Sequence, residues 1–333
     1  MGFTNVAGWP EEILGIIEKS LTSEYASLTR SGIPITIPLI SFISEDGRTL
    51  DVTTGLTYAA KAQRARNNPR VCLQYSEPLG CGLDNPPVVL IYGVATVQDA
   101  DLQANTDRYV RLSTRLFAEF GIKIPGIFLK TMTWYYARIF IKITPMRILW
   151  WESGDLNKEP KTWQAPEGTQ APPSDPPPVG KGLKQWDKPP TEWRSEAEYA
   201  LRSLGKPVLT VVDSDGYPVP FRTQSASSSP EGFHLVRYPT TPAPAQGKAC
   251  LTFHKHAAKF NWNENLTFVG EVTGDEEKAR FKVDRLLTNQ SLKKSSSQLQ
   301  TMINMLKSRR QLAPRLKAEA RRRGQPVPNI HLP

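Results

Sequence analysis

The sequence predicts a mainly β protein with flanking helices, in which two tandem β-barrel units are joined by a proline-rich linker. Three observations predict this fold: strand-like runs dominate both halves, one segment holds nine of the 29 prolines, and the same strand motifs occur twice. A chain of 333 residues, of which 39% are hydrophobic and 22% charged, is long enough to bury two such cores.

The first half consists of short apolar or alternating runs that are separated by turn signals. The tripeptide EDG at 45–47 is a hairpin signal between strands expected at 33–43 and 48–54. Apolar positions three and four residues apart predict a helix over 101–121. Further strands are expected over 71–75, 86–99 and 133–151, the last being rich in β-branched and aromatic residues.

The strand motifs of the first half recur in the second. NPRVCLQYS (68–76) aligns with QGKACLTFHK (246–255), and residues 90–110 align with 266–287. Cys72 and Gly93 are 21 positions apart, and Cys250 and Gly270 are 20 positions apart. The strand-turn-strand pattern of 207–221 matches the opening of the first half. We therefore expect a duplicated barrel in which both cysteines are buried thiols.

The proline-rich segment over 157–190 divides the chain, because prolines remove backbone donors and favour extended conformations. The expected domains are a first barrel over 1–156, a linker over 157–192, a second, degenerate barrel over 193–290, and a helical basic tail over 291–333. The tail holds most of the net charge of +10, since residues 307–323 contain eight Lys or Arg and one Glu.

The tail has two interpretations. Leu299, Met302, Ile303 and Leu306 lie at helical spacing, which indicates a helix that docks on the protein and is followed by a solvated basic arm. In the alternative, the arm contacts phosphates of nucleic acid or of a cofactor. Pro314 is expected to break or restart the helix.

The stretch TTGLTYAAKAQRARNNPRV (53–71) is the candidate anion site. We expect Thr57 to cap a helix over 58–68 that ends before the proline at position 69. Free N–H groups at a helix start suit a phosphate, and the hydroxyls of Thr53, Thr54 and Thr57 would add donors. Lys61 and Arg64 share one face of this helix. The plain alternative is a solvated basic helix between two strands.

Only the first half is expected to carry this site. The corresponding residues of the second half, YPTTPAPAQG (238–247), contain prolines that no helix interior tolerates.

The order of these elements resembles the pyridoxamine 5′-phosphate oxidase-like, FMN-binding split-barrel superfamily. That family's phosphate motif is a threonine at a strand end, a turn, and Ser-Arg-Lys opening a helix that stops at Asn-Pro. Lys61 and Asn68-Pro69 match this motif with the same separation, whereas Ala59-Ala60 occupy the Ser-Arg places and the turn is one residue longer. The resemblance covers residues 20–150 well and 200–290 in outline.

The resemblance implies that each unit is a split barrel and that a flavin lies across a dimer interface. The backbone of Ile35, Thr36, Ile37 and Pro38 would then contact the flavin ring. The second barrel would fill the partner's place in an intrachain pseudo-dimer, or the chain would form a larger homodimer.

The implied function is that of an FMN-dependent oxidoreductase acting on a small-molecule substrate, with the flavin providing the hydride chemistry. One alternative is a reductase that uses 8-hydroxy-5-deazaflavin, whose acidic tail would contact Arg64, Arg66 or the basic tail. The other is a cofactor-free or haem-binding barrel that serves as a ligand-binding or interaction module, which Ala59-Ala60 favour. Flavin chemistry requires no protein nucleophile, which agrees with a sequence that has no G-x-S-x-G, HExxH or P-loop motif.

Two histidines form a weaker motif. His254 and His256 are two residues apart and therefore share one face of a predicted strand, a geometry that can begin a metal or haem site. They are weak candidates because no third ligand is evident. The sequence has no apolar run approaching about 18 residues and no signal-peptide pattern, so we expect a cytoplasmic protein without membrane contact.

Overall fold

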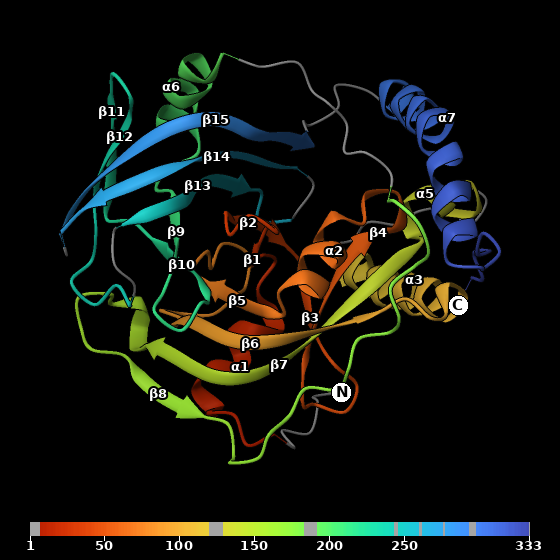
Figure 1. Cartoon of the computed structure of the whole chain (residues 1–333), viewed down its shortest axis with the longest axis horizontal. Coiled ribbons are helices and arrows are strands. Elements are labelled where there is room, and N and C mark those ends of the chain that lie inside the picture. Colours follow the sequence, from red (N-terminus) through yellow and green to blue (C-terminus); the bar gives the residue numbers. More distant parts are fainter. Residues whose placement is uncertain are drawn as a thin grey trace.

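Two antiparallel sheets lie side by side in the computed structural model of the chain (Figure 1). The structure describes residues 7–119, 129–182, 192–242, 246–259, 262–275, 277–292 and 298–332. The first sheet has the strand order β2-β1-β5-β6-β7-β4-β3, with β8 beside β7, and the second has the order β10-β9-β13-β14-β15-β12-β11. The expected mainly β fold of two tandem split barrels is confirmed.

The first half contains strands in the expected places and four α-helices among the described residues, one of them short. Its elements are α1 Glu11–Lys19, β1 Ser23–Leu28, β2 Pro34–Leu39, β3 Ser41–Ile43, β4 Leu50–Gly55, the 3-10 turn η1 Leu56–Tyr58, α2 Ala60–Asn67, β5 Arg70–Tyr75, β6 Val88–Gln98, α3 Leu102–Glu119, β7 Arg138–Trp151 and β8 Lys161–Gln164. The short helix, α5 Thr133–Tyr136, precedes β7, so the strand expected from residue 133 begins five residues late.

The second half repeats this order of strands. Its elements are α6 Trp193–Ser203, β9 Val208–Val212, β10 Pro218–Arg222, β11 Ser225–Ser229, β12 Gly232–Val236, β13 Gly247–His256, β14 Asn263–Gly274, β15 Lys278–Leu292 and α7 Gln298–Arg322. Between β12 and β13, the described residues form no helix, which agrees with the prolines there.

The duplication is visible in the register of the strands. Cys72 pairs with Ala26 of β1, and Cys250 pairs with Thr210 of β9, so both cysteines occupy the same place in their sheets and are fully buried. The alignment holds as far as β6 and β14. Beyond them it is wrong, because 102–119 is a helix whereas 278–292 is a strand.

Each half has a glycine at the same place in its sheet, about 20 residues after the cysteine. Gly93 and Gly270 both lie at a register shift, where the next strand crosses closely. A Cβ on Gly93 would lie 2.4 Å from Ile143 Cγ2, and a Cβ on Gly270 would lie 1.9 Å from the carbonyl oxygen of Lys282. Only glycine fits at both bulges.

The two barrels pack against each other through equivalent strands. Strand β2 contacts β9 and β13, while its counterpart β10 contacts β1 and β5. The outward-facing Cys72, Leu90 and Trp151 of the first sheet belong to the same apolar cluster as the interior of the second barrel. The barrels therefore face each other as the subunits of a symmetric dimer do, within one chain.

The proline-rich segment lies along the first sheet for part of its length. Strand β8, inside the expected linker, pairs with β7. Further on, Thr96 Oγ1 donates to the carbonyl of Pro172 over 2.6 Å, and the N–H of Val97 donates to Ser174 Oγ over 2.9 Å. The limits of the four expected domains stay a prediction.

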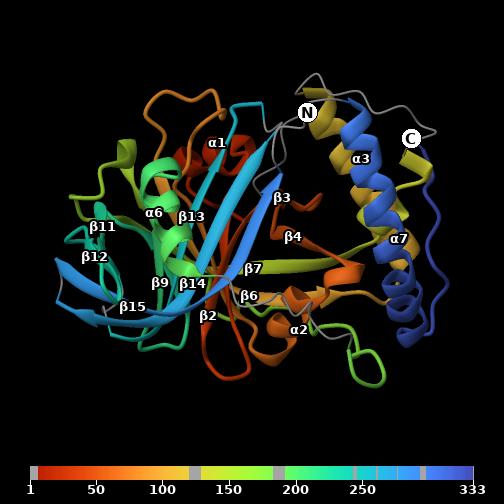
Figure 2. The ribbon, with the colours of Figure 1, turned by 90° about the horizontal axis from the view of Figure 1, so that it is seen from above.

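Helix α7 covers the first barrel on the side away from the second sheet (Figures 1 and 2). Leu316 and Ala320 enter the core of the first barrel beside Leu56. The helix continues through Pro314, so the expected break there is wrong. Burial of Leu312 and Leu316 on the barrel offsets the hydrogen bond that the proline removes.

The remaining predictions for the tail concern side chains outside the described set, namely those of Leu299, Met302, Ile303 and Leu306. Among the described helices, none has both the length and the apolar character needed to cross a membrane.

Candidate functional site

The end of β4 and the start of β7 bring a third basic residue to the predicted anion site. Thr54 pairs with Ile139, and Gly55 pairs with Arg138. A Cβ on Gly55 would lie 3.5 Å from Arg138 Nη1 and 3.7 Å from Thr57 Oγ1, so the guanidinium and the hydroxyl border the same space. The sequence could not reveal Arg138, because it lies more than 60 residues beyond the motif.

Lys61 is partly buried in the first turn of α2. Burial, together with the positive charges of Arg138 and Arg64, lowers the pKa of its ammonium to about 7. These two guanidinium groups are thus close enough to repel Lys61. Lys61 forms no ion pair with any described residue.

Arg64 reaches from α2 to the boundary between the barrels. Its Nε donates to Ser27 Oγ over 2.9 Å, while its buried Nη2 has no hydrogen-bond partner among the described residues. The titratable side chains that most influence the pKa of Arg64 are Tyr25 of the first barrel and Cys250 of the second barrel. Burial raises the pKa of Tyr25 to about 12 and raises the pKa of Cys250, so both groups are neutral near pH 7.

Arg138 is held by aromatic rings, and no carboxylate of the described residues pairs with it. Its guanidinium lies 4.4 Å from the ring centre of Tyr109 and 4.5 Å from that of Tyr135, and Nη2 donates to the Tyr109 hydroxyl over 3.3 Å. Its Nε is buried without a hydrogen-bond partner in the described part of the chain. Arg138 therefore retains an unused donor.

We define Lys61, Arg64 and Arg138 as the cationic cluster. Within the described residues, its three charges face no carboxylate, and two of its buried N–H groups are unpaired. Buried like charges without a counter-ion are unfavourable, and an oxyanion would relieve both the repulsion and the missing hydrogen bonds. The cluster fits a phosphate group.

The threonines of the motif contribute less than expected. Thr54 Oγ1 donates to the carbonyl of Tyr58 over 2.8 Å, which stabilises η1. Thr57 lies inside η1 and does not cap α2, whose N-cap position is Ala59 without a capping side chain. Thr53 is buried and pairs with Phe140. The expected helix start was wrong because the chain forms a 3-10 turn first, whereas the end at Asn67 agrees with the Asn-Pro stop.

The four residues expected to contact a ring lie in β2, against the second barrel. Ile35 and Thr36 are buried, while Ile37 and Pro38 are partly exposed. The Thr36 hydroxyl lies 2.5 Å from that of Thr210, and its carbonyl accepts from Thr252 Oγ1 over 3.1 Å. The second barrel thus takes up the polar groups of Thr36.

The two histidines of β13 are both buried, and one of them lies at hydrogen-bond distance from a carboxylate. His254 Nε2 lies 2.9 Å from Glu24 Oε1, and Arg222 Nη2 lies 2.8 Å from the same oxygen. Among the residues that the structure describes, no group of three or more His, Cys, Asp or Glu side chains could hold a metal ion.

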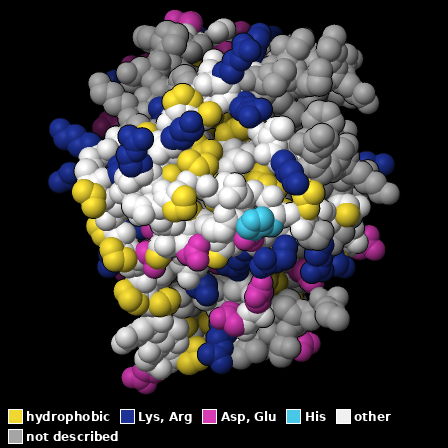
Figure 3. Space-filling model, turned by 90° about the vertical axis from the view of Figure 1, so that its right-hand side faces the viewer, with side chains coloured by type: hydrophobic (Ala, Val, Ile, Leu, Met, Phe, Trp, Pro, Cys, Tyr) yellow, Lys and Arg dark blue, Asp and Glu magenta, His cyan; other side chains and the backbone are white. Residues whose placement is uncertain are grey.

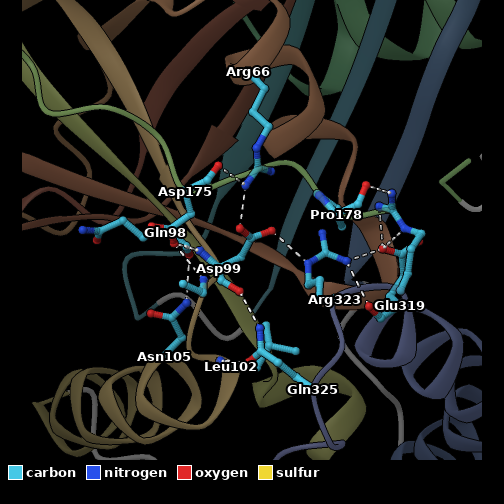
Figure 4. Close-up of polar contacts among 12 residues, drawn as sticks. Arg66, Gln98, Asp99, Leu102, Asn105, Asp175, Pro178, Glu319, Arg323 and Gln325 are labelled. Atoms are coloured by element: carbon cyan, nitrogen blue, oxygen red, sulfur yellow. Dashed lines mark hydrogen bonds and ion pairs between the residues drawn. The ribbon is translucent and has the colours of Figure 1, made fainter. Parts of the chain in front are cut away.

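The basic tail is engaged with the first barrel (Figure 4). Asp99 binds Arg66 Nη2 through Oδ1 over 2.5 Å and Arg323 Nε through Oδ2 over 2.8 Å, and Arg323 also pairs with Glu319. Nearer the motif, Arg315 Nε donates to the carbonyl of Thr57 over 3.3 Å.

Other basic side chains of the tail lie on the surface. Figure 3 shows Lys and Arg side chains spread over this side of the molecule, with acidic side chains among those of the lower half. The end of the tail is thus a docked part of the fold and not a solvated arm.

Three solved structures resemble less than half of this chain each. An F420 reductase shares 19% identity over 42% of this chain and 97% of its own, with a TM-score of 0.31. A pyridoxamine 5′-phosphate oxidase-related, FMN-binding protein from Nostoc punctiforme shares 18% identity over 44% and 85%, with a TM-score of 0.33. A Clostridium acetobutylicum protein of the pyridoxinephosphate oxidase family shares 12% identity over 45% and 89%, with a TM-score of 0.30.

No family model and no curated protein matches the sequence. At these identities the ligands of the three proteins do not transfer to this chain, so its site has to be argued from its own residues.

Proposed function

We propose that the chain binds a phosphorylated flavin, in the first place FMN, between its two barrels and acts as a flavin-dependent oxidoreductase on a small molecule. The observation that supports the proposal is the cationic cluster of Lys61, Arg64 and Arg138, which lacks a carboxylate partner among the described residues. A phosphate dianion would accept hydrogen bonds from all three side chains.

The chain's own residues would bind and enclose the cofactor. The cluster would hold the phosphate beside Gly55, and Arg64 would join that site to the face of the second barrel near Cys250. The backbone of the partly exposed residues Ile37 and Pro38 would contact the ring, and the second barrel would exclude water from the far side. When bound, the flavin supplies hydride and electron transfer.

A second function is supported by β2. The hydroxyl and carbonyl of Thr36 are hydrogen-bonded to the second barrel and are not available to a flavin ring. Ala59-Ala60 provide no side-chain donors for its phosphate. In this second proposal the chain is a cofactor-free module that binds a smaller phosphate compound. The deazaflavin alternative loses part of its support, since Arg66 and Arg323 are paired with Asp99.

The first test is the affinity of the purified chain for FMN. Lys61→Met is expected to weaken FMN binding about tenfold to hundredfold, because it removes one charge-assisted hydrogen bond. The affinity is measured by titrating flavin fluorescence. Riboflavin, which lacks the phosphate, is expected to bind the wild type and the variant equally.

Lys158→Met serves as the matched control, because Lys158 is 79% exposed on a distant turn. Equal FMN affinity of wild type and Lys61→Met would show that α2 is not the phosphate site. Failure to bind either FMN or 8-hydroxy-5-deazaflavin, with retained binding of inorganic phosphate, would favour the cofactor-free module.

The pH dependence of FMN binding is the second test. Lys61 has a pKa of about 7 without ligand, so it is protonated below pH 7 and loses its charge above it. Binding of a phosphate dianion favours the protonated form, so affinity should fall as pH rises from about 7 to 9, by up to about tenfold per unit. Lys61→Met should abolish this slope. A slope that persists in the variant would assign the titration to another group.

A further inference from the structure

An open cleft lies where the turn between β9 and β10 meets the first sheet. Its volume is about 550 Å³, which is within the range of small-molecule sites. Arg70, Tyr92 and Arg147 of the first sheet and Asp215 and Tyr217 of the turn line it, and the loop over 164–169 closes one side. It shares no residue with the cationic cluster.

Arg147 is the most constrained cation of this cleft. Its guanidinium carbon lies over the ring of Tyr92, 3.9 Å from the centre, and its side chain is 32% exposed. The nearest carboxylate oxygen, Oδ2 of Asp213, is 3.9 Å from Nη2. Its Nε is buried without a hydrogen-bond partner among the described residues.

The turn explains why Asp213 does not approach more closely. Its Oδ1 accepts the N–H groups of Asp215 over 3.1 Å and Tyr217 over 2.8 Å, so this carboxylate shapes the turn. This turn also places the ring of Tyr217 edge-on to that of Tyr92, with 5.4 Å between the ring centres. The carboxylate is therefore committed to the fold and leaves Arg147 only partly neutralised.

A second cation extends the same surface. The Arg70 guanidinium lies 6.0 Å from the ring centre of Tyr217, is exposed, and forms no ion pair with a described residue. Two acidic side chains, Asp215 and Glu167, also line the cleft, and both are exposed to solvent, which screens their charge.

We propose that this cleft binds a small aromatic oxyanion, with its carboxylate or phosphate on Arg147 and Arg70 and its ring against Tyr217. The planar guanidinium of Arg147 presents parallel donors to such a group, and the tyrosines provide an apolar wall. Because both barrels supply lining residues, the site exists only when they are packed together. The inference does not rest on the flavin proposal.

The proposal is tested by titrating the full chain with benzoate and with phenyl phosphate in a calorimeter, using benzyl alcohol as the neutral probe. At least one anion is expected to bind, and benzyl alcohol much more weakly. Arg147→Met should weaken anion binding about tenfold or more, and Arg147→Lys should restore only part of it. The preferred anion identifies the carboxylate or phosphate class.

The Lys61→Met variant distinguishes anion binding in this cleft from anion binding at the cationic cluster. Binding that persists in Lys61→Met and is lost in Arg147→Met supports the proposal. Absence of anion binding in Lys61→Met, or equal affinity in Arg147→Met, overturns it. Modification of wild-type Arg147 by phenylglyoxal, followed by mass spectrometry, provides a readout without substitution, since the bound anion should slow it. An unchanged rate at a saturating anion concentration counts against the site.

Discussion

Replacing Glu24 by alanine is expected to destabilise the chain by about 3–5 kcal/mol, which is the usual cost of removing one partner from a buried charge cluster. Glu24 Oε1 accepts from Ser76 Oγ over 2.7 Å, from Arg222 Nη2 over 2.8 Å and from His254 Nε2 over 2.9 Å. Ser76 belongs to the first barrel, whereas Arg222 and His254 belong to the second. The variant would leave Arg222 without its carboxylate at the boundary between the barrels.

The acid limb of stability provides an independent readout of the same carboxylate. Burial on its own raises the pKa of Glu24, but the hydrogen bond from His254 and the charge of Arg222 outweigh it and hold the pKa below the usual value. The stabilisation is therefore present above the usual pKa of about 4.3 and is lost as pH falls through the lower folded-state value. Glu24→Gln should lose this acid dependence.

Urea unfolding of matched variants measures both effects. Glu24→Gln retains an acceptor oxygen and should cost less than Glu24→Ala. Glu12→Ala breaks a contact with Lys161 in which the side chain of Glu12 is 52% exposed and that of Lys161 is 49% exposed. This change should cost no more than about 1 kcal/mol. If Glu24→Ala costs no more than Glu12→Ala, the cluster does not stabilise the packing of the barrels.

Replacing Asp99 by alanine is expected to cost a similar amount, about 3–5 kcal/mol, and to release α7 from the first barrel. The Asp99 side chain is 2% exposed and pairs with Arg66 and Arg323, which are 9% and 3% exposed. Its backbone carbonyl also accepts from Gln325 Nε2 over 2.8 Å. Without the carboxylate, two buried guanidinium groups repel each other, and only Glu319 still pairs with Arg323.

Hydrogen exchange distinguishes release of α7 from general destabilisation. The amides of 312–322 should exchange faster in Asp99→Ala under conditions where those of β5 and β6 stay protected. Asp155→Ala, which removes an exposed contact to Lys158, is the control and should change neither. Uniform acceleration over the whole chain would show that Asp99 stabilises the fold without a specific role in docking the helix.

Local patterns were sufficient for most strands and for the duplication as far as β6 and β14. Cys72 and Cys250 lie in apolar, strand-like runs, and the glycines that follow recur because a bulge excludes any side chain. Lys61 and Arg64 were found because one helix carries both. The prediction failed at Thr57 and Pro314, where turn geometry and the packing of α7 outweighed local preference.

The sequence by itself determined the mainly β fold, its repetition and one basic motif, because each is encoded within a few neighbouring residues. Only the tertiary structure decided which charges meet. Glu24 and His254 are 230 positions apart and Asp99 and Arg323 are 224 positions apart, so no periodicity relates them. The same holds for Arg138, which strand pairing brings to Lys61, and for Arg147 and Tyr217, which meet because the second barrel packs on the first. Contacts of this kind depend on how sheets are stacked, and side-chain order along the chain does not encode that stacking locally.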